Sequence, residues 1–224
     1  MSKLILVPTP IGNLEDITLR AIRIFKEADL IFSEDTRVTK KLLDYLGISK
    51  KCLPFHAHNE HRFLEKSIEL IQNAPYAVLA SDAGTPGISD PGFLLVRACI
   101  QNGIEVECLP GPTAFVPALV ASGFPSDKFV FEGFLPHKKG RQTRLKLLSI
   151  EERTIILYES PHRLLKTLEQ MFEHFEPTRE ICVVREISKM FETYHRGQLQ
   201  EILAYFKQNT PKGEIVILIK GIDD

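Results

Sequence analysis

The 224-residue sequence lacks the marks of several common protein classes. Its four cysteines, Cys52, Cys99, Cys108 and Cys182, form no C-x-x-C pair and no spacing suited to zinc, so we expect reduced thiols and no metal site. No apolar run approaches the length of a membrane span, and Met1 leads directly into an apolar segment without a charged leader. We therefore expect a cytoplasmic protein with no membrane partner.

Two nucleotide-binding motifs are also absent. Neither G-x-G-x-x-G nor G-x-x-x-x-G-K-[ST] occurs, which argues against a standard dinucleotide site or P-loop. The formal net charge of -1 gives no general basic signal, so contact with a nucleic acid would rest on a local patch or on a structured partner. With 44% hydrophobic and 25% charged residues, the composition is that of a globular protein of one or two domains.

Residues 81–92 (SDAGTPGISDPG) concentrate glycines, prolines and carboxylates directly after a predicted buried strand at residues 76–80. Loops at the carboxyl ends of strands bind ligands in open α/β sheets. Glycine lets a ligand approach the main chain, and proline stiffens the loop. Asp90 followed by Pro91 predicts the start of a helix that ends near Gly103. We interpret residues 81–92 as a ligand-contacting loop.

Strands are predicted to alternate with helices through residue 122. The predicted strands are residues 4–7, 30–33, 76–80 and 104–109, and helices are predicted at residues 16–28 and 37–46. This order predicts a parallel, doubly wound sheet whose strand-end loops share one rim. Charges of both signs at residues 34–37 suggest a cleft there, although a capped helix explains Asp35 and Thr36 equally well.

The composition turns loop-like at residues 122–127 (SGFPSD), where we place a boundary between domains 1–122 and 123–224. The second half has predicted strands at residues 129–134, 154–158, 181–185 and 214–219, and helices near residues 141–149, 161–175 and 198–207. A further short strand at residues 191–197 would follow directly on the strand that ends at Arg185. We therefore expect a mixed sheet in an α/β carboxyl-terminal domain.

Two polar segments allow more than one interpretation. Residues 137–146 (HKKGRQTRLK) form a local basic run, which suits either an exposed loop that neutralises phosphates or a solvated helix face. Residues 56–61 (HAHNEH) contain three histidines and a glutamate, but they match no zinc-site spacing. We interpret them as a polar active-site loop.

Eight segments together resemble the tetrapyrrole methylase superfamily. They are VPTPIGNLEDIT (7–18), SEDTR (33–37), HAHNE (56–60), SDAGTPGISDPG (81–92), LPGPTA (109–114), FEGFLP (131–136), YESPHR (158–163) and GEIV (213–216). Within the superfamily the chain is similar to bacterial members that methylate a cytidine ribose 2′-hydroxyl in 16S RNA of the small ribosomal subunit. The resemblance covers residues 4–220. It implies a homodimer of two-domain α/β chains, with the active site in the cleft between the domains.

The resemblance also implies S-adenosylmethionine as the methyl donor. The positions in this sequence that match the family's donor contacts are Pro10, Ile11, Gly12, Asp82, Gly84, Thr85, Thr113, Ala114, Tyr158 and Gly213. Glycines would let adenosine lie against the backbone, and Asp82 would bind amino or hydroxyl groups of the donor. Carbonyl groups would face the positive sulfonium.

Methylation of a ribose hydroxyl needs alignment of the reactants and a group that accepts or orients the hydroxyl proton. The candidates for that group are Asp35, His58, Glu60 and Glu159, and the sequence singles out none of them. Phosphates of the RNA are expected to contact basic side chains, with ordinary ion pairs as the alternative role. These side chains are Arg37, Lys138, Lys139, Arg141, Arg144, Arg163, Arg185 and Lys189.

Two departures from the family pattern bear on the substrate. Members usually carry a small helical extension after the final strand, whereas this sequence stops at Asp224. Residues 185–192 (REISKMFE) follow the pattern R-E-[LI]-T-K-x-x-E-E only in part. Two alternatives therefore stay open: a methyltransferase that acts on a tetrapyrrole or another small molecule, and a non-catalytic protein that binds S-adenosylmethionine or ribosomes. For the main hypothesis we expect the assembled small subunit, with its folded RNA, as the partner.

Overall fold

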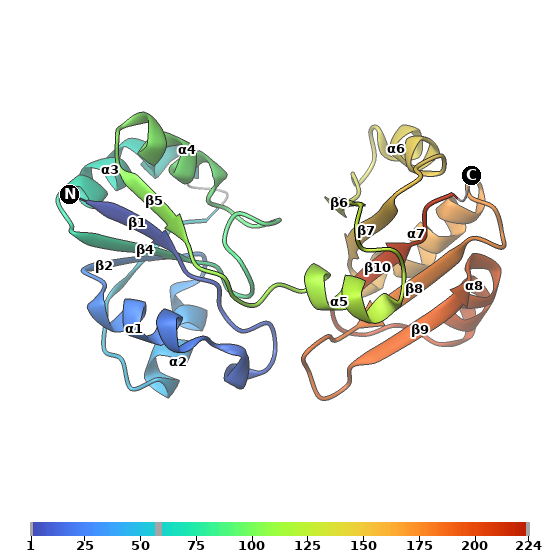
Figure 1. Cartoon of the computed structure of the whole chain (residues 1–224), viewed down its shortest axis with the longest axis horizontal. Coiled ribbons are helices and arrows are strands. Elements are labelled where there is room, and N and C mark those ends of the chain that lie inside the picture. Colours follow the sequence, from blue (N-terminus) through green and yellow to red (C-terminus); the bar gives the residue numbers. More distant parts are fainter. Residues whose placement is uncertain (1, 57–59, 223–224) are drawn as a thin grey trace. The chain divides into compact units, whose positions relative to one another are not determined.

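A computed structural model describes residues 2–56 and 60–222, with the backbone alone at residues 60–62. The chain divides into two compact units, residues 1–113 and 114–224 (Figure 1). Each unit contains one five-stranded sheet with helices. The expected α/β fold with a parallel first sheet and a mixed second sheet is confirmed.

The sheet of the first unit is entirely parallel, with strand order β3-β2-β4-β1-β5. Its strands are β1 (Lys3–Leu6), β2 (Leu30–Ser33), β3 (Cys52–Pro54), β4 (Tyr76–Ala80) and β5 (Glu105–Cys108). The edge strand β3 was not predicted, because three residues that end in proline are too few to show an alternation of apolar and polar side chains. Proline is tolerated at such an edge because one side of the strand has no ladder partner.

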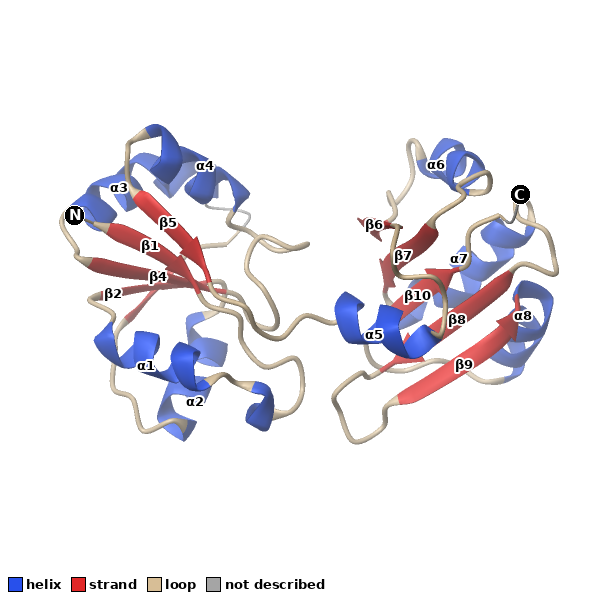
Figure 2. Cartoon of the chain, viewed as in Figure 1, coloured by secondary structure: helices blue, strands red, loops and turns tan. Residues whose placement is uncertain are grey.

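Alternate residues of β1 and β4 point to opposite faces, and both faces are buried. Ile5 and Val78 belong to one apolar cluster, whereas Leu4 and Leu79 belong to another. Helices α1 (Leu19–Glu27) and α2 (Thr36–Tyr45) cover the first face, and α3 (Glu60–Gln72) and α4 (Phe93–Gln101) cover the second (Figure 2). Burial on both faces explains why these strands read as continuous apolar runs.

Two helix starts differ from the expected ones. Helix α1 begins after Thr18, whose side chain caps it, because Leu14–Asp16 form a separate 3-10 turn. Helix α4 begins after Gly92 and not at Asp90. Gly92 has a φ of +137°, and a β-carbon there would lie 2.9 Å from Leu79 Cδ2. The loop therefore passes close over β4 at Gly92, and the helix begins only after this residue. Asp90 stays in the loop.

The sheet of the second unit is mixed, with strand order β6-β7-β10-β8-β9. Only β6 and β7 are parallel, and the other neighbours are antiparallel. The strands are β6 (Phe129–Phe134), β7 (Thr154–Glu159), β8 (Glu180–Arg185), β9 (Thr193–Gln198) and β10 (Ile215–Ile219). The short strand expected to follow β8 is therefore present as β9, and it runs back along β8 as a hairpin.

Helices α6 (Arg141–Leu148), α7 (Pro161–Phe172) and α8 (Leu199–Gln208) pack on one face of this sheet. Helix α7 starts as expected, with the Ser160 side chain as cap and Pro161 in the first turn. Helix α5 (Phe115–Ser122) covers the other face, where Ala118 and Leu119 join the buried cluster. The boundary of the compact units thus lies before α5, whereas the sequence analysis expected it after residue 122.

Candidate active site

Three loops at the carboxyl ends of the parallel strands are fastened to one another in the first unit. Thr9 after β1 and Gly84 after β4 exchange two backbone hydrogen bonds of 2.9 Å. The Thr9 hydroxyl also donates to the Ser81 carbonyl at 3.1 Å, and the Thr85 hydroxyl donates to the Pro112 carbonyl at 3.1 Å. These bonds form a continuous rim from loops that lie more than 25 residues apart in sequence.

Glycine is required at this rim for two different reasons. Gly84 has a φ of +83°, a left-handed conformation that side chains with a β-carbon rarely adopt. Gly111 lies so close to Pro8 that a β-carbon there would be 2.7 Å from Pro8 Cβ. Small residues therefore allow the loops after β1, β4 and β5 to meet.

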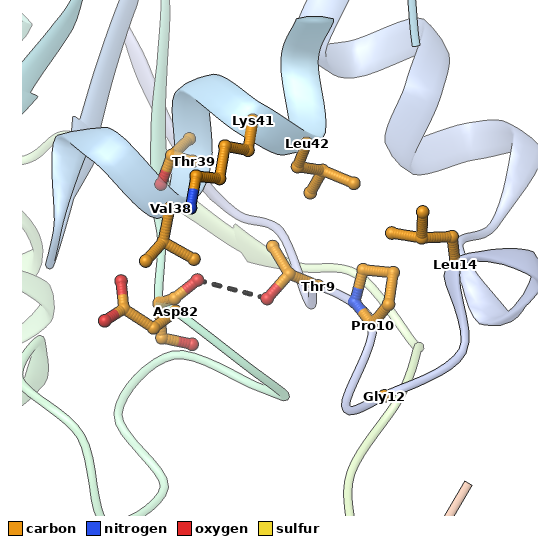
Figure 3. A pocket seen from close by; sticks show the side chains of 10 residues that line it. Thr9, Pro10, Gly12, Leu14, Val38, Thr39, Lys41, Leu42 and Asp82 are labelled. Carbon is orange, nitrogen blue, oxygen red and sulfur yellow. Dashed lines mark hydrogen bonds between the residues drawn. The ribbon is translucent and has the colours of Figure 1, made fainter. Parts of the chain in front are cut away.

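A pocket of 270 Å³ opens beside this rim, between the loop after β1 and helix α2. Figure 3 shows Val38, Lys41 and Leu42 on α2 across from Thr9 and Pro10. Gly12, Leu14, Thr39, Ser81 and Asp82 complete the lining. The pocket therefore has an apolar wall, one amine and one carboxylate.

Thr39 adds an unusual group to the pocket wall. The residue is 2% exposed, and its hydroxyl oxygen has no hydrogen-bond partner among the described residues. Buried hydroxyls are nearly always satisfied in native proteins. The oxygen itself is buried, although the residue lines the pocket.

Three carboxyl groups gather at the ends of β2 and β4. Burial, and after it the charge of the nearby Glu34, raise the pKa of Asp90 to about 7. Burial and Asp82 likewise raise the pKa of Glu34. The pKa of Asp82 is raised by burial, although the backbone amide of Asp35 donates to its Oδ1 at 2.9 Å and opposes the shift. Carboxyl groups with raised pKa values are suited to proton transfer near neutral pH.

Sequence analysis did not name Glu34 or Asp90 as functional. Asp90 was interpreted as a helix cap, and Glu34 was passed over beside Asp35. The available signal was their position, because both follow buried parallel strands inside segments rich in charge or glycine. Parallel strands bring such positions to one edge.

Asp35 has a different environment. Its carboxylate caps helix α2 by accepting from the Arg37 amide at 2.8 Å, and it forms an ion pair with the Arg37 guanidinium at 2.6 Å. The hydrogen bonds from Arg37 lower the pKa of Asp35 to about 2. A carboxylate with so low a pKa is a weak base. The capped-helix interpretation of Asp35 therefore accounts for its position, and Arg37 remains mostly exposed beside it.

Glu159 lies inside the second unit, and its side chain is 1% exposed. One carboxylate oxygen accepts from the Thr167 hydroxyl at 2.6 Å and lies 3.6 Å from the Arg141 guanidinium. The other accepts from the Ser160 amide at 2.8 Å and lies 3.3 Å from Arg163. Both oxygens are thus occupied within the core, which argues against the expected role of Glu159 as a base.

The basic run of residues 137–146 is divided between the core and the surface. Arg141 is 4% exposed and donates to Gln170 and Thr167, so it is not available to an RNA phosphate as expected. Arg144 is paired with Glu132. Lys138 and Lys139 at the turn before α6 and Lys146 within α6 are exposed, and none of the three forms an ion pair among the described residues.

Three other predicted phosphate contacts take part in structural networks. The Arg163 guanidinium donates to the Leu135 carbonyl at 2.9 Å as well as pairing with Glu159. Lys189 lies 3.1 Å from Glu186 and 3.2 Å from Glu214. Among the described residues, Arg185 donates to the Thr193 hydroxyl and to two backbone carbonyls.

The remaining predicted positions lie in both units. Thr113 and Ala114 occupy the junction between β5 and α5. Tyr158 packs edge-on against Phe131 and Phe134 in the second unit, with ring centroids 5.1 and 5.7 Å away. His58 lies outside the described residues, and Glu60 begins α3 without a described side chain.

Within the described ranges, no group of three or more His, Cys, Asp or Glu side chains is placed to hold a metal ion. None of the helices in those ranges is long and apolar enough to cross a membrane. His56 follows β3 and is half-buried, and its charge lowers the pKa of Glu34. It therefore belongs to the electrostatic surroundings of the carboxyl cluster.

Two solved structures show that this chain has a known fold. A uroporphyrin-III-C-methyltransferase from Thermus thermophilus matches with a TM-score of 0.67 at 21% identity, covering 97% of this chain and 94% of that one. A diphthine synthase matches with a TM-score of 0.75 at 12% identity, covering 98% and 90%. These matches define the chain as a tetrapyrrole-methylase-like α/β fold.

The family described as Tetrapyrrole (Corrin/Porphyrin) Methylases matches residues 3–203, and the chain belongs to it. A ribosomal RNA small subunit methyltransferase I of Thermotoga maritima is 45% identical over 221 residues, 99% of each chain. Proteins of the same name from Synechocystis and Escherichia coli O157:H7 are 49% and 47% identical, over 99% and 98% of this chain and 80% and 78% of theirs.

Family membership makes the chain an S-adenosylmethionine-dependent methyltransferase. The rim of the first unit suits such a donor chemically. Asp82 offers a partly exposed carboxylate, and Ile11 supplies an apolar contact next to the buried Gly84.

Proposed function

We propose that this protein transfers a methyl group from S-adenosylmethionine to the 2′-hydroxyl of a cytidine ribose in small-subunit ribosomal RNA. The observation that carries the proposal is 45–49% identity, over nearly the whole chain, to proteins named ribosomal RNA small subunit methyltransferase I. The enzyme acts in the cytoplasm as a homodimer, and the assembled small subunit is its substrate.

The donor site is proposed to be built on the rim of the first unit. The proposed contacts are Pro10, Ile11, Gly12, Asp82, Gly84, Thr85, Thr113 and Ala114, with Tyr158 and Gly213 from the second unit. The mutual hydrogen bonds of Thr9 with Gly84 and of Thr85 with Pro112 support this assignment, because they keep the loops in one arrangement before the donor arrives. A preformed site does not have to be ordered by the ligand.

Bound S-adenosylmethionine supplies an electrophilic methyl group. In the transfer, the bond from the ribose oxygen to the methyl carbon forms as the sulfur–methyl bond breaks, and the hydroxyl proton passes to a base. We propose that this base is a carboxylate of the cluster formed by Glu34, Asp82 and Asp90. Asp90 is the preferred candidate. A group with a pKa of about 7 is partly deprotonated at neutral pH and still binds a proton well.

Cations on the surface hold the RNA backbone in this proposal. Lys138, Lys139 and Arg37 are exposed, and the two lysines form no ion pair among the described residues. Each contact that displaces a counterion makes binding weaker at higher salt. The fold does not require these side chains, so their substitution tests RNA contact without loss of structure.

The test uses labelled S-adenosylmethionine and small ribosomal subunits from a strain that lacks this gene. Label at a single cytidine ribose supports the proposal, and the Asp90→Asn variant should then lower the turnover number at least tenfold, about 1.4 kcal/mol in the barrier. Absence of label on subunits and on bare transcript, with donor binding intact, contradicts it. Label on a tetrapyrrole, or donor binding without any acceptor, would favour the two alternatives.

A further inference from the structure

A second pocket, of 290 Å³, lies wholly within the second unit and is separate from the rim described above. Strands β8 and β9 supply one wall with Arg185 and His195. Helix α8 supplies the opposite wall with Tyr205 and Phe206. The segment after α8 closes the pocket with Lys212.

The described residues that line this pocket include two cations, Arg185 and Lys212, and no carboxylate. The Arg185 guanidinium donates to the Thr193 hydroxyl at 3.2 Å and to the backbone carbonyls of Phe191 and Lys212 at 2.9 and 3.4 Å. All three acceptors are neutral. Across the described ranges, neither Arg185 nor Lys212 forms an ion pair with a carboxylate, and no Asp or Glu lines the pocket.

Neighbouring carboxylates lie outside the pocket lining and accept hydrogen bonds from other groups, although, after the hydrogen bond from the Glu214 amide, the charge of Arg185 also helps to lower the pKa of Glu186. Glu186 accepts from the Glu214 amide at 2.9 Å and pairs with Lys189, and Glu192 accepts from the Ser188 amide at 2.5 Å. Burial lowers the pKa of His195, and the charge of Arg185 lowers it further. The hydrogen bonds of Arg185 thus orient a positive group at the pocket without cancelling its charge, which favours an anion.

An aromatic surface adjoins these cations. The His195 ring lies 4.6 Å from the Tyr205 ring and 5.2 Å from the Phe206 ring, measured between centroids. The Phe206 side chain is buried at 4% exposure and packs against the other two rings, whereas Tyr205 is 43% exposed. A partly exposed ring on a rigid base is a surface on which a nucleobase can stack.

We propose that this pocket binds a phosphodiester of a single-stranded RNA segment, with Arg185 and Lys212 on the phosphate and Tyr205 against an adjoining base. The inference rests on the proposed function, because it takes RNA as the substrate. It adds a contact site built from residues of the second unit. The combination of unpaired cations with an aromatic ring favours a strand with unstacked bases over a duplex.

The test measures binding of a labelled oligocytidylate of about 12 nucleotides over a series of salt concentrations. Lys212→Ala should weaken binding about threefold to tenfold and reduce the slope of log K against log salt by about 0.7, because one phosphate contact is lost. Tyr205→Leu should weaken binding at least fivefold without a change in slope, because stacking is lost. The matched control is Lys207→Ala, an exposed lysine on α8 that does not line the pocket.

Equal binding by Lys212→Ala and Lys207→Ala would overturn the inference. Competition by inorganic phosphate at concentrations equal to those of the oligonucleotide would also overturn it, since the site would then bind the free anion. Lys212 has an exposed side chain, so its variant should fold even if Tyr205→Leu does not. Methyl transfer by the wild type is measured separately. If the wild type transferred no methyl group while Lys212→Ala still weakened oligonucleotide binding, the proposed function would be rejected and the pocket would remain an RNA site.

Discussion

The side chain of Glu186 lies against the α-carbon of Gly213 and leaves no room there for a β-carbon. The Glu186 amide donates to the Glu214 carbonyl at 2.9 Å, and its carboxylate accepts from the Glu214 amide at the same distance. Lys189 completes the arrangement at 3.1 Å. Glu186 has a φ of 55°, so both sides of this contact use left-handed backbone. The turn after β8 is thereby fixed to the segment before β10.

Gly213→Ala should therefore lower the free energy of unfolding by about 2 kcal/mol or more, because it adds a steric overlap to the strain of a left-handed alanine. Urea denaturation measures this loss. Gly47→Ala is the matched control, since Gly47 has a φ of +67° with nothing within 4 Å of an added β-carbon. It should cost only about 1 kcal/mol. Equal losses in the two variants would show that Glu186 moves aside freely.

Gly111→Ala should weaken S-adenosylmethionine binding about tenfold, because the added β-carbon pushes the loop after β5 away from Pro8. Isothermal titration calorimetry measures the change. Gly103→Ala serves as the control. Gly103 precedes the amino end of β5, whereas the donor loops follow the carboxyl ends of the strands, and an added β-carbon at Gly103 meets nothing within 4 Å. Unchanged donor affinity in Gly111→Ala would mean that the contact between these loops does not shape the donor site.

Asp90→Asn should stabilise the protein at pH 8 but not at pH 4. The folded state raises the pKa of Asp90 from 3.8 to about 7, so it favours the protonated form. Its contribution to stability is present below pH 4 and is lost as the pH rises through 7. Asparagine stays neutral, so the gain at pH 8 should be on the order of 2 kcal/mol, reduced from the full shift by solvent screening.

Chemical denaturation at the two pH values measures this difference, with the exposed Asp127→Asn as control. A gain of the same size at both pH values would point to packing as its cause. Loss of stability at pH 8 would mean that the charged carboxylate is stabilised by a partner, and would remove the basis for proton transfer by Asp90.

Glu159→Gln should lower the free energy of unfolding by about 3 kcal/mol, because it leaves the buried Arg141 without its countercharge. Urea denaturation should show the loss, while the folded variant keeps methyl transfer. Glu151→Gln removes an ion pair with the half-exposed Arg153 and should cost about 0.5 kcal/mol. Normal stability of Glu159→Gln with lost transfer would return Glu159 to a catalytic role.

Much of the architecture was predictable from local patterns. Strands such as β4 and β10 are short apolar runs bounded by charged or turn-forming residues, so both their extent and their burial follow from the sequence. The alternation of strands and helices predicted a parallel sheet, and that topology predicted one rim for the loops near Thr9 and Gly84. The hydrogen bonds between those two residues confirm that the loops meet.

The sequence by itself determined most of the elements, the family and the loops that carry the special residues, because each depends on neighbours along the chain. Tertiary structure alone decided what the charged residues do. Glu159 and Asp90 are both carboxyl groups near strand ends, but the first is surrounded by donors in a core and the second lies beside other carboxyl groups. Their protonation depends on burial and on charges brought from distant strands, which no local pattern records.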